Sequence, residues 1–127
     1  MESTSSNGRR VLIVDDEKVI AVTLSIIFAG KGYEVRKAYS AEEGLSILEG
    51  WAPDLALLDV CLPGMNGIDL AIHMKNAYPQ CCILLISGKP DSMDLLDRAT
   101  RSGYVLELMA KPVPPTVLLD RVAQLLA

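Results

Sequence analysis

Short apolar runs alternate with longer amphipathic stretches along almost the whole chain. Most of the apolar runs end abruptly at a polar residue, which is typical of strands buried on both faces of a sheet. Between the runs, apolar residues recur at the spacing of one helix face. The predicted strands cover residues 11–14, 34–38, 55–59, 82–87 and 105–110. The predicted helices cover approximately residues 20–30, 41–49, 66–78, 92–102 and 115–125.

Local signals support several of these helix boundaries. Residues 40–43 read Ser-Ala-Glu-Glu, which is a capping-box pattern. Asn66 is a suitable N-cap, and Pro114 and Pro115 suit the first turn of the last helix. The boundaries therefore agree with the apolar periodicity.

Strands that alternate with helices predict βαβ units, right-handed crossovers and a parallel sheet covered on both faces. The sequence thus predicts an α/β fold. The second strand, residues 34–38, is the most polar, so we expect it at an edge of the sheet.

The composition fits one globular domain. The chain has 127 residues, of which half are apolar and 22% are charged, and this excludes a disordered chain. The net charge is −4 and no basic block is present, which argues against direct nucleic-acid binding. No apolar run reaches the length of a membrane span. We expect residues 1–9 to be a short flexible tail and residues 10–127 to form the domain.

The cysteines favour a reducing compartment. Cys61, Cys81 and Cys82 are odd in number, and a disulfide between the adjacent pair would be strained. The only histidine, His73, leaves too few ligands for a zinc site. Reduced thiols and the lack of an apolar leader predict a cytoplasmic protein.

Charged and hydroxyl side chains gather where the predicted strands end. Asp15 and Asp16 follow the first strand, Asp59 ends the third, Ser87 ends the fourth, and Lys111 follows the fifth. The carboxyl ends of parallel strands meet at one edge of a sheet, where such folds bind ligands. Clustered carboxylates suit Mg²⁺, with Mn²⁺ as a substitute. An aspartate beside Mg²⁺ and a lysine can attack a phosphoryl group.

These segments resemble those of response-regulator receiver domains, the phospho-accepting modules of two-component signalling. The matching segments are VLIVDDE (residues 11–17), LALLDVCLPGMNG (55–67), LLISGK (84–89) and AKP (110–112). The resemblance covers about residues 10–126. It implies a single-domain, flavodoxin-like (βα)5 fold with a doubly wound, five-stranded parallel sheet in the order 2-1-3-4-5.

The resemblance also implies roles for individual residues. Asp59 would be the phosphoacceptor. Asp16 and Asp59 would bind Mg²⁺ through their side chains, the Cys61 backbone carbonyl would be a third ligand, and Asp15 would act largely through metal-bound water. Ser87 would donate a hydrogen bond to the phosphoryl group. Lys111 would pair with that group.

Two further positions match the pattern of the family, and a third departs from it. Gly88 matches its preference for a small residue that leaves the acceptor open to a donor protein. Pro112 matches its Lys-Pro pair, where the peptide bond is usually cis. Leu108 departs from it, because receivers commonly carry Tyr or Phe three residues before the lysine. Tyr104 lies four residues earlier and is not an obvious substitute.

Other interpretations of the same residues remain open from the sequence. Asp15 and Asp16 would also serve as a helix cap, and Lys111 as a surface lysine. An aspartate-nucleophile phosphatase of the haloacid-dehalogenase type is the alternative function, but it needs an acid where this chain has Cys61. A flavodoxin-like cofactor binder would need a glycine-rich loop after the first strand, where this chain has acids.

The receiver interpretation implies particular partners. The phosphoryl donor would be a histidine kinase or a histidine phosphotransfer protein. The output would pass to a partner protein, without direct contact with nucleic acid or membrane. We expect a monomer or a weak dimer, a signalling switch rather than an enzyme, with at most self-phosphorylation from donors and slow autodephosphorylation.

Overall fold

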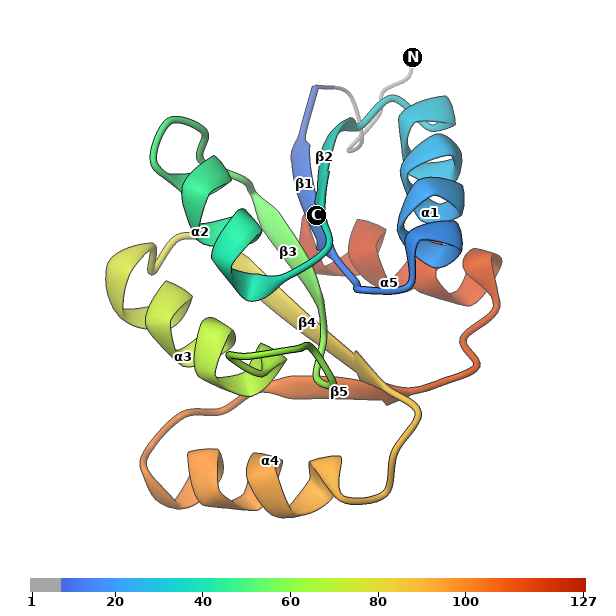
Figure 1. Ribbon diagram of the computed structural model, residues 1–127. Coiled ribbons are helices and arrows are strands. Elements are labelled where there is room, and N and C mark those ends of the chain that lie inside the picture. Colours follow the sequence, from blue (N-terminus) through green and yellow to red (C-terminus); the bar gives the residue numbers. More distant parts are fainter. Residues whose placement is uncertain (1–7) are drawn as a thin grey trace.

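The computed structural model describes residues 8–127, which fold around a central parallel sheet (Figure 1). The strand order is β2-β1-β3-β4-β5, and every pairing is parallel. The predicted fold class and strand order are therefore confirmed. The strands are β1 (Arg10–Val14), β2 (Glu34–Ala38), β3 (Leu55–Asp59), β4 (Cys82–Ser87) and β5 (Glu107–Ala110).

Helices cover both faces of this sheet (Figure 1). One face packs against α1 and α5, and the other against α2, α3 and α4. The helices are α1 (Lys18–Gly30), α2 (Ala41–Leu48), α3 (Gly67–Ala77), α4 (Ser92–Arg101) and α5 (Pro115–Leu125). Alternate residues of the central strands enter opposite clusters, so Leu57 faces α1 and α5 while Leu58 faces α2, α3 and α4.

The predicted caps begin two of the helices. The Ser40 hydroxyl accepts a hydrogen bond from the Glu43 amide at 3.1 Å, and the Glu43 carboxylate accepts one from the Tyr39 amide at 2.7 Å. The Asn66 side chain accepts one from the Asp69 amide at 2.9 Å. These bonds satisfy amides that a helix start leaves unpaired, which explains why α2 and α3 begin directly after the predicted caps Ser40 and Asn66.

The two edge strands differ from the buried central ones. The prediction that the polar second strand lies at an edge is confirmed. The other edge strand, β5, begins at Glu107 rather than at Val105 as predicted, because its pairing with β4 begins at Glu107. Val105 is 84% exposed, so its apolar side chain marked a connecting segment rather than a buried strand.

The beginning of the described chain joins the sheet edge. Residues 1–7 of the expected tail lie outside the described residues. Gly8 donates a hydrogen bond to the Gly32 carbonyl at 3.2 Å, and the Arg9 carbonyl accepts one from the Glu34 amide at 2.8 Å. Within residues 8–127, none of the helices is long and apolar enough to cross a membrane. All three cysteines are free thiols.

Candidate phosphoacceptor site

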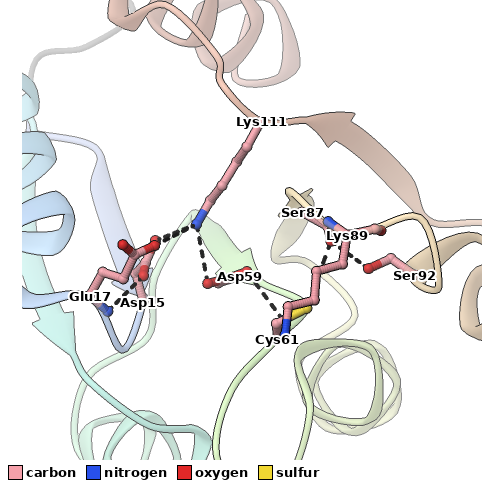
Figure 2. A network of polar contacts seen from close by, with 8 residues as sticks. All are labelled: Asp15, Glu17, Asp59, Cys61, Ser87, Lys89, Ser92 and Lys111. Carbon is pink, nitrogen blue, oxygen red and sulfur yellow. Dashed lines mark hydrogen bonds and ion pairs between the residues drawn. The ribbon is translucent and has the colours of Figure 1, made fainter.

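The carboxyl edge of the sheet brings the predicted site residues together (Figure 2). Asp15 follows β1, Asp59 and Ser87 end β3 and β4, and Lys111 follows β5. Their side chains meet because parallel strands place their carboxyl ends on one edge. The Lys111–Pro112 peptide bond is cis, as predicted.

Three carboxylates form an oxygen-rich cluster at this edge. Asp15, Asp16 and Asp59 each offer one oxygen, and these atoms all lie within 4.8 Å of one another. Asp15 and Asp59 are buried, whereas Asp16 is exposed. A hard cation such as Mg²⁺ takes one or two carboxylates and keeps several waters. A cluster of carboxylate oxygens in which Asp16 faces solvent fits this requirement. The donor set therefore fits the predicted metal.

Lys111 supplies a positive charge between the buried carboxylates. Its Nζ atom lies 3.2 Å from Oδ2 of Asp15, 3.2 Å from Oδ2 of Asp59 and 3.6 Å from Oε1 of Glu17. Burial opposes the charge on Lys111, but Asp59 and Asp15 more than offset this, so the pKa of Lys111 is raised above its ordinary value. The amine therefore stays charged at neutral pH.

The environment of Asp59 disfavours its ionised form. Burial is the largest cause that raises the pKa of Asp59, and the neighbouring Asp15 adds to it. Lys111 and the Cys61 amide oppose the shift; that amide donates a hydrogen bond to Oδ1 of Asp59 at 3.2 Å. The pKa remains raised on balance, so a bound cation would favour the carboxylate that can act as a nucleophile.

A pocket of about 320 Å³ opens above Asp59. It is large enough for a phosphoryl group, and both charged and small side chains line it. Its lining residues are Asp16, Glu17, Asp59, Cys61, Gly88, Lys89 and Lys111. A Cβ atom on Gly88 would lie 3.5 Å from Cβ of Lys111, which is an ordinary contact. Local packing therefore does not require a glycine at this position.

Ser87 is buried at the end of β4, but its hydroxyl contacts α4 and the preceding loop (Figure 2). It hydrogen-bonds the Ser92 hydroxyl and accepts a hydrogen bond from the Lys89 amide at 3.1 Å. Among the residues drawn in Figure 2, no contact joins Ser87 to Asp59. The Ser87 hydroxyl also lies 3.9 Å from Sγ of Cys61, so in this conformation it contacts the start of α4 and the loop after β3, but not Asp59 itself.

Leu108 and Tyr104 pack against the same cluster. Both are half-buried beside the core that α2, α3 and α4 cover. Leu108 pairs with Leu85 across the sheet, and the Tyr104 hydroxyl accepts a hydrogen bond from the Asn76 side-chain amide at 3.1 Å. Tyr104 precedes β5, and its hydroxyl is hydrogen-bonded to α3. Its ring therefore does not take the place of the side chain at position 108.

Sequence reasoning missed three residues of this site. Glu17 directly follows the predicted acidic pair and contacts Lys111, so its acidic type was a usable signal. Gly67 packs against the backbone of Asp59, and Ser92 contacts Ser87. A glycine or a serine at the start of a helix is common, and neither carries a signal of these contacts in the sequence.

Comparison with known families agrees with this geometry. A family model of the response regulator receiver domain matches residues 11–123. The chain belongs to this family. A curated relative, "Regulator of RpoS" of Escherichia coli (strain K12), is 35% identical to this receiver domain over 106 residues, which are 84% of this chain and 31% of the relative. The receiver domain thus spans about a third of that relative's length.

Solved structures resemble this receiver domain along most of its length. A CheY-like response regulator receiver domain protein from Methanospirillum hungatei is 32% identical, with a TM-score of 0.85 and 94% of each chain covered. A response regulator from Burkholderia pseudomallei is 27% identical, with a TM-score of 0.76 over 91% of this chain and 65% of that one. That structure contains a phosphorylated aspartic acid, a calcium ion and citrate.

These matches settle the class of function. The chain is a receiver domain of the two-component response regulators, which are signalling switches. Phosphorylation on aspartate is typical of this family, receivers generally bind Mg²⁺ at an acidic pocket, and this chain has a cluster of three aspartates at the carboxyl edge of its sheet. The alternative, an aspartate-nucleophile phosphatase, finds no support in these relatives.

Proposed function

We propose that Asp59 of this receiver domain accepts a phosphoryl group from a phosphohistidine donor in a Mg²⁺-dependent step. The observation that carries the proposal is the position of Asp59, which lines an open pocket with the Lys111 amine 3.2 Å from one of its oxygens. The phosphorylated aspartic acid of the Burkholderia pseudomallei relative supports the same chemistry.

The transfer step exchanges one bond for another. A carboxylate oxygen of Asp59 attacks the phosphorus, the bond from phosphorus to the donor's imidazole nitrogen breaks, and the imidazole leaves with the electron pair. Lys111 offsets charge on the phosphoryl oxygens, and Ser87 donates a hydrogen bond to one of them after it turns away from α4. Water then removes the phosphoryl group slowly and regenerates the carboxylate.

The residues that would hold Mg²⁺ are the side chains of Asp16 and Asp59 and the backbone carbonyl of Cys61. Asp15 would stay in the outer sphere, because its Oδ1 accepts a hydrogen bond from the Glu17 amide at 2.9 Å and its Oδ2 pairs with Lys111. When bound, Mg²⁺ neutralises charge on both the carboxylates and the phosphoryl oxygens.

The donor and the output of the switch are proteins in this proposal. A histidine kinase or a histidine phosphotransfer protein would supply the phosphoryl group, and a partner protein would read the altered surface. The net charge of −4 does not favour contact with phosphate-rich nucleic acid. The three free thiols support a reducing, cytoplasmic environment.

Intact-mass measurement after incubation with a phosphoramidate and Mg²⁺ tests the proposal. We expect one added phosphoryl group on the wild type and none on Asp59→Asn. The matched control, Asp120→Asn, changes an exposed carboxylate on α5 and should label like the wild type. Chelation of Mg²⁺ should abolish labelling. Equal labelling of Asp59→Asn and the wild type would reject Asp59 as the acceptor.

A further inference from the structure

The first residue of α4 contacts the hydroxyl that we expect to bind the phosphoryl group. Ser92 begins α4, and its hydroxyl hydrogen-bonds that of Ser87 (Figure 2). We infer that Ser92 is a positioning residue that holds Ser87 away from Asp59 in the unphosphorylated protein. This inference rests on the proposed function, because it concerns the balance between the two conformations of the switch.

Both hydroxyls lie inside the protein, so their partners matter. Ser87 is 3% exposed and Ser92 is 2% exposed. Ser87 also accepts a hydrogen bond from the Lys89 amide at 3.1 Å and lies 3.4 Å from the Lys89 carbonyl. A buried hydroxyl that loses its partner is costly. This small network therefore stabilises the conformation in which Ser87 faces α4.

Ser87 cannot keep these contacts and also serve a phosphoryl group. A serine hydroxyl has one proton to donate. If Ser87 donates it to a phosphoryl oxygen, it cannot donate to the Lys89 carbonyl, and the contact with Ser92, in which either hydroxyl can donate, is kept only while the two oxygens stay close. The movement also takes the Ser87 oxygen away from Ser92. Phosphorylation of Asp59 thus competes directly with the contact to Ser92.

Release of Ser92 would act on α4 because few of its side chains are fully buried, and Leu95 and Leu96 are only partly buried against the core. Ser92 and Ala99 are its only buried residues. The Ser92 amide donates a hydrogen bond to the Lys89 carbonyl at 3.2 Å, so the loop and the first turn of α4 are joined at the same residue. The hydroxyl contact between Ser87 and Ser92 therefore links the phosphoryl site to α4 without a ring at Leu108.

Beryllofluoride binding in the presence of Mg²⁺ tests the inference, with the amide resonances of Gly88 and Lys89 as the readout. Ser92→Ala should tighten beryllofluoride binding by about three- to tenfold, which corresponds to the loss of one hydrogen bond from the unliganded state. Without beryllofluoride, the same resonances should shift part of the way toward their bound positions. The matched control at the C-cap of α4, Ser102→Ala, changes an exposed serine and should leave both readouts unchanged.

A double-mutant cycle separates this coupling from a general loosening of α4. In a Ser87→Ala background, Ser92→Ala should have no further effect on beryllofluoride affinity. If Ser92→Ala does not fold, Ser92→Cys provides the comparison, since a thiol fits the site but bonds weakly. Unchanged affinity in folded Ser92 variants, or equal tightening in the Ser87→Ala background, overturns the inference while the proposed function stands. Failure of the folded wild type to bind beryllofluoride rejects the proposed function itself.

Discussion

A Cβ atom on Gly67 would lie 2.1 Å from the backbone carbonyl oxygen of Asp59. The backbone of Gly67 is not in the left-handed region, so close approach rather than φ requires glycine here. Its amide also donates a hydrogen bond to the Val60 carbonyl at 2.9 Å. The start of α3 therefore lies directly against the end of β3 and fixes the backbone of the proposed phosphoacceptor.

We expect Gly67→Ala to destabilise the protein by about 1–3 kcal/mol, because the added methyl group meets backbone atoms that cannot move aside cheaply. Labelling of Asp59 should also slow, since the end of β3 must shift. Urea unfolding and the intact-mass assay measure the two effects. Gly30→Ala is the control, because nothing lies within 4 Å of a Cβ atom at Gly30. Wild-type stability of Gly67→Ala would contradict the close contact.

The raised pKa of Asp59 predicts that Asp59→Asn is more stable than the wild type without Mg²⁺. Burial is the main cause of the shift, so the folded protein holds this proton more tightly than the unfolded chain. Wild-type stability therefore falls as the pH rises from the ordinary Asp range through the raised pKa, and stays lower at pH 7. Removing the charge should raise the free energy of unfolding by on the order of 1 kcal/mol.

Thermal unfolding in a chelator measures this gain, with Asp120→Asn as the control for loss of an exposed carboxylate. Lys111 keeps Asp15 and Glu17 as partners in Asp59→Asn. A lower melting temperature for Asp59→Asn than for both the wild type and Asp120→Asn would show that the ion pair with Lys111 outweighs the burial of Asp59.

The metal assignment predicts a different outcome for Asp16. Asp16→Ala should remove most of the stabilisation that Mg²⁺ gives, because an exposed carboxylate oxygen leaves the cluster. Without Mg²⁺ the variant should be as stable as the wild type or slightly more so, since one repulsive charge is gone. Melts with and without Mg²⁺ measure both effects, with Asp120→Asn as the control for loss of an exposed carboxylate. Full Mg²⁺-dependent stabilisation of Asp16→Ala would contradict the assignment.

The arrangement of the site was largely predictable because it depends on topology. Asp15, Asp59 and Lys111 each follow or end a predicted strand, and parallel strands bring such positions to one edge whatever the details of packing. The same reasoning placed the polar β2 at an edge. These predictions needed only the alternation of strands and helices and the polar residues at the strand ends.

Contacts that depend on side-chain conformation were not predictable in this way. The sequence placed Ser87 near Asp59, but its hydroxyl bonds Ser92, and this choice depends on how the loop enters α4. The closeness of Gly67 to Asp59 depends on the angle at which α3 leaves the turn. The apolar side chain of Val105 suggested a strand, but β5 begins only where β4 offers hydrogen-bonding partners.

An ion pair between β5 and α5 predicts a pH-dependent contribution to stability. Arg121 hydrogen-bonds Glu107 through its guanidinium, and these bonds hold the pKa of Glu107 below its ordinary value. The contribution is therefore present above the ordinary Glu pKa and is lost as the pH falls through the lowered pKa. Because both side chains are solvent-exposed by about one third, solvent screens the pair and its contribution to stability is expected to be small.

Glu107→Gln should accordingly lower the free energy of urea unfolding at pH 7, and the difference from the wild type should vanish in acid below the lowered pKa. Glu49→Gln, which changes an exposed residue at the end of α2, should show no such pH-dependent difference. A deficit of Glu107→Gln that persists unchanged in acid would assign the effect to packing rather than to the charge.

The absence of a ring at Leu108 predicts where phosphorylation changes the structure. A shift from about 1:99 to 99:1 requires roughly 5.5 kcal/mol of differential stabilisation, which contacts of the phosphoryl group with Lys111 and Ser87 would supply in large part. Leu108 is an aliphatic residue paired with Leu85. It therefore has no aromatic ring that could rotate inward when Ser87 moves. We therefore expect beryllofluoride to change amide exchange mainly in residues 87–91 and α4, with little change at Leu108. Larger changes around Leu108 than around Ser87 would show that β5 transmits the signal despite its aliphatic residue.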